Sequence, residues 1–401
     1  MRPDISITDY NYELPDERIA KFPFARRDEA RLLTFVDGAI DATVFSTLPA
    51  LLPAHSLLVF NETKVIPARL HFRRDTGAAI ELFCLEPFSP ADYEQSFAAH
   101  SSCIWKCIAG HGKRWKGDRL KRPFGATVLQ AERLEKRADD VLVRFSWDGG
   151  SPFARVLEQC GVTPIPPYLK RDAVPDDAER YQTVYARHNG SVAAPTAGLH
   201  FTQETLEAIA RRGVASESIT LHVGAGTFRP VKSATIAEHV MHEEPFAVRR
   251  QTLQTLLSHT GPTVAVGTTA TRTLESLYFL GQQCLHGKTP QPVSQWEACS
   301  TPCAAAPAEA LQALCDYMDS RHITTLYSAT RLLIAPPYRF KIVRGLITNF
   351  HQPQSTLLLL VGALIGDRWR DVYDYALRNN FRFLSYGDSS LLWATESKEP
   401  A

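Results

Sequence analysis

The sequence has no apolar segment long enough to cross a membrane. Its most apolar run, residues 357–365, is nine residues long, whereas a transmembrane helix needs about 20. The pattern of a basic stretch followed by an apolar one, typical of a secretion signal, is missing from the first residues. The eight cysteines are diluted through 401 residues, so we expect reduced thiols in a cytoplasmic protein rather than a disulfide framework.

The sequence also lacks an excess of charge of one sign. Lysine and arginine number 44 and aspartate and glutamate 43, which gives a formal net charge of +1. No overall field therefore favours a nucleic acid or a membrane surface, and an anionic partner must be held by a local patch. The apolar share of 44% is ordinary for a globular protein, and 401 residues favour two or three domains.

Clear zinc-binding patterns are missing as well. Pairs spaced Cys-x-x-x-Cys begin at Cys103 and at Cys299, but this spacing is looser than that of the usual zinc knuckle. His239 and His242 would share one face if their segment is a helix, yet the HExxH and HxxEH patterns are both absent. We expect no metal, and keep a zinc hydrolase that uses these histidines and a cysteine pair as an alternative.

Two kinds of pattern divide the chain. Residues 70–150 contain short alternating segments separated by Gly-rich turns, which predicts an inserted small all-β barrel domain. Residues 1–69 and 151–401 alternate strand and helix patterns, which predicts an α/β domain whose mixed, largely parallel sheet is covered by helices. Residues 282–308 are rich in Pro, Ser, Thr and Ala and are predicted to form a long loop before a helix that begins at Pro307.

Several predicted strands end in polar or glycine-rich turns. The strands are residues 56–60, 218–223, 263–266 and 342–348. Residues 191–202, SVAAPTAGLHFT, form another such turn before a helical run. Ligands of open α/β sheets bind outside the carboxyl ends of the strands, so His200 on this small-residue turn is placed to face a ligand. The alternative is that His200 only packs or caps locally.

Two of these turns are rich in glycine and threonine. The Gly-Ala-Gly-Thr turn at residues 224–227 does not match a dinucleotide fingerprint, because Arg229 stands at the third glycine position. It can still bring backbone N–H groups close to a ligand, or serve only as a tight turn. Gly-Thr-Thr at residues 267–269 opens a helix with Arg272 just inside. This suits a carboxylate or phosphate, or else plain N-capping.

The densest basic run covers residues 111–122, with Trp105 and Trp115 nearby. Its cations include Lys113, Arg114, Lys116 and Arg119. Cations for phosphates and rings for stacking suit RNA, whereas such a run is also typical of a solvated hairpin loop. A non-catalytic RNA-binding module is therefore a further alternative.

Short motifs occur in a fixed order along nearly the whole chain. They are YELP at 12–15, LVFN at 58–61, VIPAR at 65–69, YQTVY at 181–185, AAPTAGLHF at 193–201, TLHVGAGTF at 220–228, EHVMH at 238–242, TNFH at 348–351 and SYGD at 385–388. One such piece would be weak, but this many in order are specific. The sequence resembles the S-adenosylmethionine:tRNA ribosyltransferase-isomerases of queuosine biosynthesis.

The resemblance implies an unusual use of S-adenosylmethionine as a ribosyl donor. The ribosyl moiety would be transferred to 7-aminomethyl-7-deazaguanine in the anticodon wobble position of a tRNA and isomerised, giving epoxyqueuosine and releasing adenine and methionine. The resemblance also implies an α/β domain with an inserted barrel, a barrel contact with tRNA, no metal, and a monomer.

Such a reaction needs a base beside the sulfonium, an acid for the departing adenine, and a site that keeps water out. We assign the acid–base groups to His200, His222, His239 and His242, with Glu244 and Asp388 to orient or charge them. The nucleoside would contact Pro195, Thr196, Ala197, Gly198, Gly224, Gly226 and Thr227. The methionine carboxylate would contact Thr268, Thr269 and Arg272, and the acceptor base Asn349 and His351. The basic run of residues 111–122 would contact tRNA.

Three positions depart from the pattern of the family that the sequence resembles. Arg331 stands where aspartate is usual, Pro337 where glycine is usual, and Ser390 where methionine is common. Residues 282–322 also form a longer stretch than expected. We therefore keep, as an alternative, a paralogue with the same donor chemistry and a different acceptor.

Overall fold

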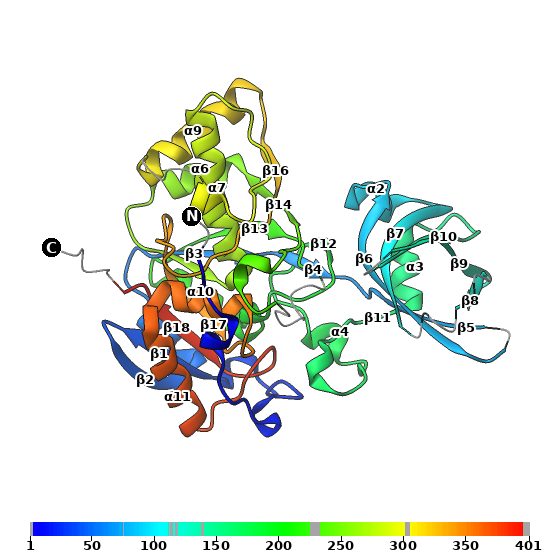
Figure 1. Ribbon diagram of the computed structural model, residues 1–401, viewed down its shortest axis with the longest axis horizontal. Coiled ribbons are helices and arrows are strands. Elements are labelled where there is room, and N and C mark those ends of the chain that lie inside the picture. Colours follow the sequence, from blue (N-terminus) through cyan, green and yellow to red (C-terminus); the bar gives the residue numbers. More distant parts are fainter. Residues whose placement is uncertain are drawn as a thin grey trace.

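The computed structural model describes residues 3–74, 76–110, 112, 115–116, 119–137, 140–224, 233–300 and 305–395. These residues form an α/β domain and a β-barrel that lies beside it along the long axis of the molecule (Figure 1). The two bodies confirm the predicted fold class of a mixed, helix-covered sheet with an inserted barrel.

A nine-stranded sheet forms the centre of the α/β domain. From edge to edge its strands are β16 (Thr325–Thr330), β14 (Glu244–Arg249), β13 (Ala215–Leu221), β3 (Leu57–Asn61), β15 (Thr263–Val266), β17 (Val343–Asn349), β18 (Ser389–Trp393), β1 (Arg31–Val36) and β2 (Ala39–Val44). The four strands β13, β3, β15 and β17 run parallel, and β18 runs antiparallel to β17. The sheet is therefore mixed, with a parallel centre, as the sequence predicted.

Helices cover both faces of this sheet. They are α1 (Leu48–Leu51), α5 (Gln203–Arg211), α6 (Arg250–Ser258), α7 (Thr268–Leu285), α9 (Pro307–Ser320), α10 (Thr356–Ile365) and α11 (Trp369–Arg378). Successive side chains of a strand point to opposite faces, and β3 shows this directly. Leu57 and Val59 join the core with α7, whereas Leu58 and Phe60 join the core with α5. A strand that is buried on both faces has a continuous run of apolar residues, and such runs predicted these strands from the sequence.

Residues 282–300 form more regular structure than the predicted loop. Helix α7 continues to Leu285, and a short helix α8 (Glu297–Ser300) follows. Val293 pairs with Thr330 at the edge of the sheet, with its backbone N–H 2.9 Å from the Ala329 carbonyl. The predicted helix at Pro307 is confirmed as α9.

The barrel has six antiparallel strands, β5 to β10, and a seventh short strand, β11, is added to the sheet by pairing with β5. Its order is β11 (Gly161–Val162), β5 (Arg69–Arg73), β6 (Ala79–Ser89), β7 (Ser102–Gly110), β10 (Val141–Ser146), β9 (Thr127–Lys136) and β8 (Leu120–Phe124). A pairing of Arg73 with Lys121 joins β5 to β8 and closes it. Helices α2 (Tyr93–Ala98) and α3 (Phe153–Cys160) pack on its core. Strand β11 lies beyond residue 150, where the sequence pattern placed the end of the barrel.

The remaining elements are two short strands, a one-turn helix and several 3-10 turns. Strands β4 (Thr63–Val65) and β12 (His188–Ser191) pair with each other, and α4 (Asp177–Arg180) is a single turn. The 3-10 turns are Ile7–Tyr10, Asp16–Arg18, Arg27–Glu29, Phe45–Thr47, Pro167–Leu169, Thr196–His200, Ile236–Glu238 and Gly366–Arg368.

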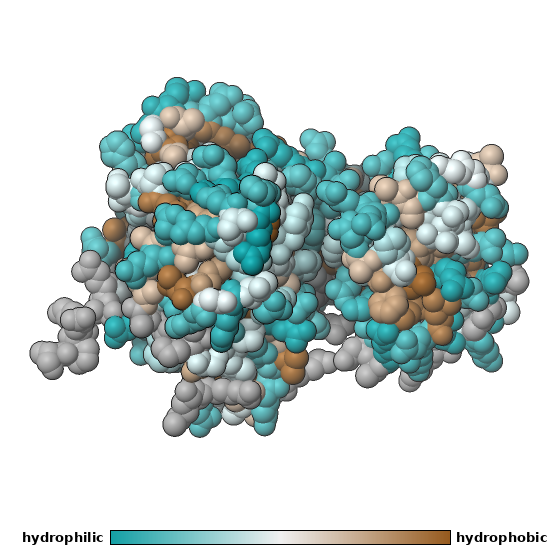
Figure 2. Space-filling model, turned by 90° about the horizontal axis from the view of Figure 1, so that it is seen from above, coloured by the Kyte–Doolittle hydropathy of each residue, from teal (hydrophilic) through white to brown (hydrophobic). Residues whose placement is uncertain are grey.

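The surface between the two bodies is hollowed (Figure 2). A cavity of about 890 Å³ lies there, lined by α2 and β6 of the barrel and by β13, β14 and β16 of the α/β domain. Over the part of the chain that the structure describes, no helix has both the length and the apolar character needed to cross a membrane.

Candidate functional site

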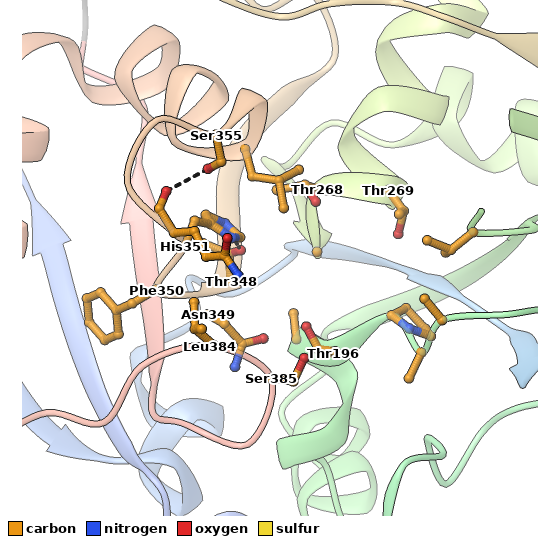
Figure 3. Close-up of a pocket in the computed structure, with 18 of the residues that line it drawn as sticks. Thr196, Thr268, Thr269, Thr348, Asn349, Phe350, His351, Ser355, Leu384 and Ser385 are labelled. Atoms are coloured by element: carbon orange, nitrogen blue, oxygen red, sulfur yellow. Dashed lines mark hydrogen bonds between the residues drawn. The ribbon is translucent and has the colours of Figure 1, made fainter. Parts of the chain in front are cut away.

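The turns after the central parallel strands meet at one edge of the sheet, where they surround a pocket (Figure 3). Strands β15 and β17 end there, and the 3-10 turn Thr196–His200 faces them across the pocket. The lining residues are Tyr168, Ala193, Ala194, Pro195, Thr196, Ala197, Val223, Gly267, Thr268, Thr269, Thr348, Asn349, Phe350, His351, Gln352, Ser355, Leu357, Leu384 and Ser385. The pocket lies where the strand-end rule predicted a ligand.

Two helices begin at this pocket. Helix α10 is capped by Ser355, whose Oγ accepts a hydrogen bond from the Leu358 N–H at 3.2 Å and donates one to the Gln352 carbonyl (dashed in Figure 3). Helix α7 starts at Thr268 after Gly267, and among the described residues no side chain forms a capping hydrogen bond with its first turn. Its first N–H groups therefore lack side-chain partners at an edge of the pocket, and such a helix end attracts an anion.

Gly267 makes the sharp entry into α7 possible. Its φ of +89° is a conformation that residues with a side chain rarely adopt. Its N–H donates to the Ile347 carbonyl at 2.8 Å, so the turn stays attached to β17. The backbone conformation of Gly267 thus places Thr268 and Thr269 at the edge of the pocket (Figure 3).

Asn349, at the end of β17, connects the pocket to His200. Its Nδ2 lies 3.0 Å from Nε2 of His200 and 3.5 Å from the Asp388 carbonyl oxygen. Asn349 is 2% exposed, and its Oδ1 has no hydrogen-bond partner among the described residues. Burial, with Arg382 and Arg27 nearby, lowers the pKa of His200 to about 3.

His351 is held in a similar way. Its Nε2 lies 2.9 Å from Thr348 Oγ1, its backbone N–H donates to the Tyr373 hydroxyl, and its carbonyl accepts from the Tyr12 hydroxyl. Burial lowers the pKa of His351 to about 3. The imidazole is therefore neutral at pH 7 and fixed at the pocket wall.

His222 lies at the junction of the two bodies rather than among the lining residues of the pocket. Its ring packs at a tilt against Tyr93 of the barrel helix α2, with centroids 4.6 Å apart, and its Nδ1 is 2.9 Å from Thr63 Oγ1. Gly190 makes room for the ring, because a Cβ atom there would lie 2.5 Å from His222 Cε1. Burial, and then His188, lower the pKa of His222 to about 4.

The segment with His239 and His242 is not a helix. A 3-10 turn ends at Glu238, His239 is extended, and His242 is exposed. The helix that would give the two histidines a common face is therefore not formed, because the chain runs on as extended backbone toward β14, the second strand from the edge of the sheet. Burial and the neighbouring His242 lower the pKa of His239. Neither histidine is among the residues that line the pocket.

Glu244 and Arg272 form a buried ion pair beside the pocket. Arg272 Nη1 contacts Glu244 Oε2, and the two side chains are 9% and 5% exposed, respectively. Arg272 Nε also donates to the Leu332 carbonyl at 3.2 Å. The guanidinium is thus directed to a carboxylate of the protein itself, and neither residue is among those that line the pocket.

Asp388 ties chain segments together behind the site. Its carboxylate accepts the Arg31 N–H at 2.9 Å and the Arg382 N–H at 2.7 Å. Burial raises the pKa of Asp388. Its carbonyl, rather than its carboxylate, reaches Asn349.

The predicted nucleoside-contacting residues are placed unequally. Pro195, Thr196 and Ala197 line the pocket. Gly198 is buried behind them, where a Cβ atom would lie 1.9 Å from the Tyr185 hydroxyl. Gly224 is not among the residues that line the pocket. Gly226 and Thr227 lie outside the described residues.

The predicted RNA-stacking use of the basic run is wrong for its aromatic residues. Trp105 and Trp115 are 0% and 2% exposed and belong to the barrel core. Lys116 and Arg119 are exposed, and Arg119 lies 3.6 Å from Glu132. Strand β8, which follows them in the sequence, lies on the side of the barrel away from the α/β domain (Figure 1). Lys113 and Arg114 lie outside the described residues.

Comparison with known proteins identifies the family. Residues 7–392 match the family described as "Queuosine biosynthesis protein". The chain belongs to this family. A protein of Trichlorobacter lovleyi named S-adenosylmethionine:tRNA ribosyltransferase-isomerase is 38% identical, with 96% of this chain and 99% of that protein aligned. One of Citrifermentans bemidjiense with the same name is 40% identical over the same shares.

A solved structure from Thermotoga maritima, an S-adenosylmethionine tRNA ribosyltransferase, is 27% identical. The match covers 96% of this chain and 99% of that chain, with a TM-score of 0.46. The family membership confirms the sequence resemblance, and the chain is an enzyme of the transferase and isomerase class to which these relatives belong.

Sequence reasoning missed several polar groups of this family member. Tyr168 and Ser385 line the pocket, and their hydroxyl groups contact each other. Glu62 is 4% exposed beside the cavity between the bodies, and its Oε2 has no hydrogen-bond partner among the described residues, although it lies 3.6 Å from Arg187 Nη1. The signal that could have singled out Glu62 was the pair of polar residues, Asn61 and Glu62, at the end of a strand whose other residues, 57–60, are apolar.

The described residues contain no group of three His, Cys, Asp or Glu side chains arranged to hold a metal ion. Cys103 and Cys107 are buried in the barrel core. Residues 301–304, which include the second cysteine of the other pair, lie outside the described residues.

Proposed function

We propose that the chain transfers and isomerises the ribosyl moiety of S-adenosylmethionine onto 7-aminomethyl-7-deazaguanine in the wobble position of a tRNA anticodon. The products would be epoxyqueuosine in tRNA, adenine and methionine. The observation that carries the proposal is the pocket, which is built from the family motifs and offers an anion-attracting helix end beside an unpartnered amide oxygen. The names of the relatives, S-adenosylmethionine:tRNA ribosyltransferase-isomerase, support the donor and the tRNA partner.

The methionine carboxylate of the donor would bind at the start of α7. The uncapped first-turn N–H groups and the hydroxyls of Thr268 and Thr269 supply the donors that a carboxylate needs. Arg272 is occupied by Glu244, so in this arrangement it supports α7 from behind rather than contacting the carboxylate. The small residues Pro195, Thr196 and Ala197 leave room for the nucleoside.

The acceptor base would contact the opposite side of the pocket. Asn349 offers Oδ1 to an N–H group, and His351 lies two residues further along the same turn. The tRNA body would contact the barrel, with Lys116 and Arg119 among its exposed cations.

The proton-transfer groups are proposed from the histidines, with Glu244 and Asp388 as supporting carboxylates. His200 reaches the pocket through Asn349, and His351 lines it. His222, His239 and His242 lie outside the described lining, so a role in the chemistry would require the bound tRNA or donor to bring them closer. Individual His→Ala variants test this, with donor binding measured separately from turnover. Wild-type turnover in all of the variants would overturn the acid–base proposal.

A turnover assay tests the reaction itself. The protein would be mixed with S-adenosylmethionine and a tRNA that carries 7-aminomethyl-7-deazaguanine, with adenine followed by chromatography and the modified nucleoside by mass spectrometry. Adenine release with the matching mass gain on tRNA supports the proposal. Donor binding without modification of this tRNA overturns the acceptor assignment, and absence of donor binding overturns the reaction.

A further inference from the structure

The amide of Asn349 has only one orientation that fits its neighbours. One end of the amide lies between His200 Nε2 and the carbonyl oxygen of Asp388. A carbonyl oxygen can only accept a hydrogen bond, so the atom at this end is the nitrogen, Nδ2. The other end, Oδ1, then faces the pocket, and Figure 3 shows it turned toward Thr196 and Ser385.

This orientation fixes the state of His200. Because Nδ2 of Asn349 is a donor, Nε2 of His200 must offer its lone pair across the 3.0 Å contact. The imidazole is therefore neutral and carries its proton on Nδ1. An imidazolium, or the Nε2–H form, would place two donors against each other.

The surroundings of His200 favour the same neutral state. Its ring packs on Phe45, with centroids 5.2 Å apart, and is 4% exposed. Arg27, Arg382 and Asp388 are the charged groups around it, and the guanidinium groups disfavour a further positive charge. Burial is the larger cause of the lowered pKa.

We infer that His200 is a positioning residue that holds the Asn349 amide so that Oδ1 accepts a hydrogen bond from an N–H group of the acceptor base. This inference rests on the proposed function for the identity of the ligand. In this inference His200 acts as a fixed hydrogen-bond acceptor and is no longer one of the proposed proton-transfer groups. The pocket then selects a base with an N–H donor at this point and disfavours one that presents only acceptors there.

Nitrogen NMR of the histidine side chains tests the fixed state without any turnover. With ¹⁵N-labelled full-length protein, the His200 signals are assigned by their loss in His200→Gln. We expect Nδ1 to be protonated and Nε2 unprotonated, with no change between pH 6 and pH 8. An imidazolium signal, or protonation on Nε2, in this range overturns the inference.

Two substitutions at His200 separate positioning from proton transfer. Glutamine can place an acceptor oxygen near the position of Nε2 but cannot act as a base, whereas leucine supplies neither. With the tRNA acceptor, we expect His200→Leu to lower kcat/KM by about 10- to 100-fold, and His200→Gln to restore it to within about 5-fold of wild type. The binding constant for S-adenosylmethionine, measured alone, serves as the control for folding.

A loss in His200→Gln as deep as in His200→Leu would overturn the inference. A limb lost from the pH–rate profile of both variants would, in addition, identify His200 as the base. A wild-type protein that releases no adenine would instead overturn the proposed function. The NMR result would still decide the state of His200 in that case, so the two failures are distinguishable.

Discussion

The charged and polar side chains closest to the pocket are mostly bound to other parts of the protein. The Asp388 carboxylate joins two backbone N–H groups, and the Arg272 guanidinium joins Glu244 and a carbonyl. A buried charge is tolerated when it is paired and hydrogen-bonded. Such residues can be essential to the site because they position its walls, while the groups that we propose to contact the ligand are hydroxyls, N–H groups, the Asn349 amide oxygen and the His351 imidazole.

Replacing Arg272 with methionine separates these two kinds of role. Glu244 would be left buried without its partner, so we expect the free energy of unfolding to fall by roughly 3–5 kcal/mol, measured by urea denaturation. The double variant Arg272→Met with Glu244→Gln removes the stranded charge and should recover at least half of the loss. If Arg272 instead holds the donor carboxylate, the single variant would keep its stability and lose affinity for S-adenosylmethionine.

At the residue scale the sequence predicted the turns better than the contacts. His200, Thr268 and Asn349 were singled out because they follow strand patterns, and that pattern is local. The pairing of His200 with Asn349 joins positions 149 residues apart, and the burial of Trp105 depends on the closed barrel. Contacts of this kind cannot be predicted from the separation of the residues along the chain or from their residue types.

Among the elements, helix α7 connects the site to the core. It is an 18-residue helix that is buried along most of its length, and it begins without a side-chain cap at the pocket. Its apolar packing fixes its direction, and this direction aims the N–H groups of the first turn. The sequence predicted both this helix and its polar start, because glycine and threonine after an apolar strand are local signals.

Helix α7 leads to a prediction about the donor. Decarboxylated S-adenosylmethionine keeps the adenosyl group and the sulfonium but lacks the carboxylate that would bind at Thr268. We expect it to bind about 5- to 30-fold more weakly than S-adenosylmethionine, from a loss of about 1–2 kcal/mol at the helix end. Calorimetry at low ionic strength measures both constants. Equal affinities would show that the carboxylate binds elsewhere.

The segment after residue 238 shows where element prediction fails. Its His-x-x-His spacing fits a helix, but the chain there is extended and is fixed by Gln295, whose side chain bonds the Met241 N–H at 3.0 Å and the His239 carbonyl at 2.7 Å. Gln295 lies in the predicted loop of residues 282–308. Tertiary contacts from a distant segment thus override the local pattern.

Over the whole molecule, buried neutral histidines link stability to pH. Unfolded histidines take up protons below about pH 6.5, whereas burial keeps the pKa of His200, His222 and His351 at about 3 to 4. The unfolded state therefore binds more protons as the pH falls. Their contribution to stability is complete above pH 6.5 and is lost progressively as the pH falls toward 3.

The variant His200→Gln isolates one of these histidines. Between pH 6 and pH 5, the free energy of unfolding should fall less steeply than in wild type by about 1–1.4 kcal/mol per pH unit. Urea denaturation at both pH values measures the two slopes, and the carboxyl groups common to both proteins cancel. Identical slopes would mean that His200 titrates normally in the folded state.

The joint between the two bodies is the feature of the whole molecule that local sequence patterns reveal least. Tyr93 packs on Trp105 of the barrel core, with centroids 6.0 Å apart, and on His222 of the α/β domain, at 4.6 Å. It therefore connects the barrel to the end of β13. Residues 66–68 and 163–166 connect the two bodies covalently, and Val192 also packs in the barrel core, so the Tyr93 ring contact is one of the contacts that restrain the relative position of the two bodies.

Replacing Tyr93 with alanine should loosen that restraint. A ring pair contributes about 0.5–1.5 kcal/mol. We therefore expect conformations in which the barrel has moved away from the α/β domain to become about 2- to 10-fold more populated, which would be measured as faster hydrogen exchange over residues 66–68. KM for tRNA should rise by a similar factor, because tRNA would contact both bodies, whereas the affinity for S-adenosylmethionine should stay within 2-fold. Tyr93→Phe keeps the ring and should behave like wild type. Equal exchange and equal KM in Tyr93→Ala and Tyr93→Phe would show that other contacts hold the barrel in place.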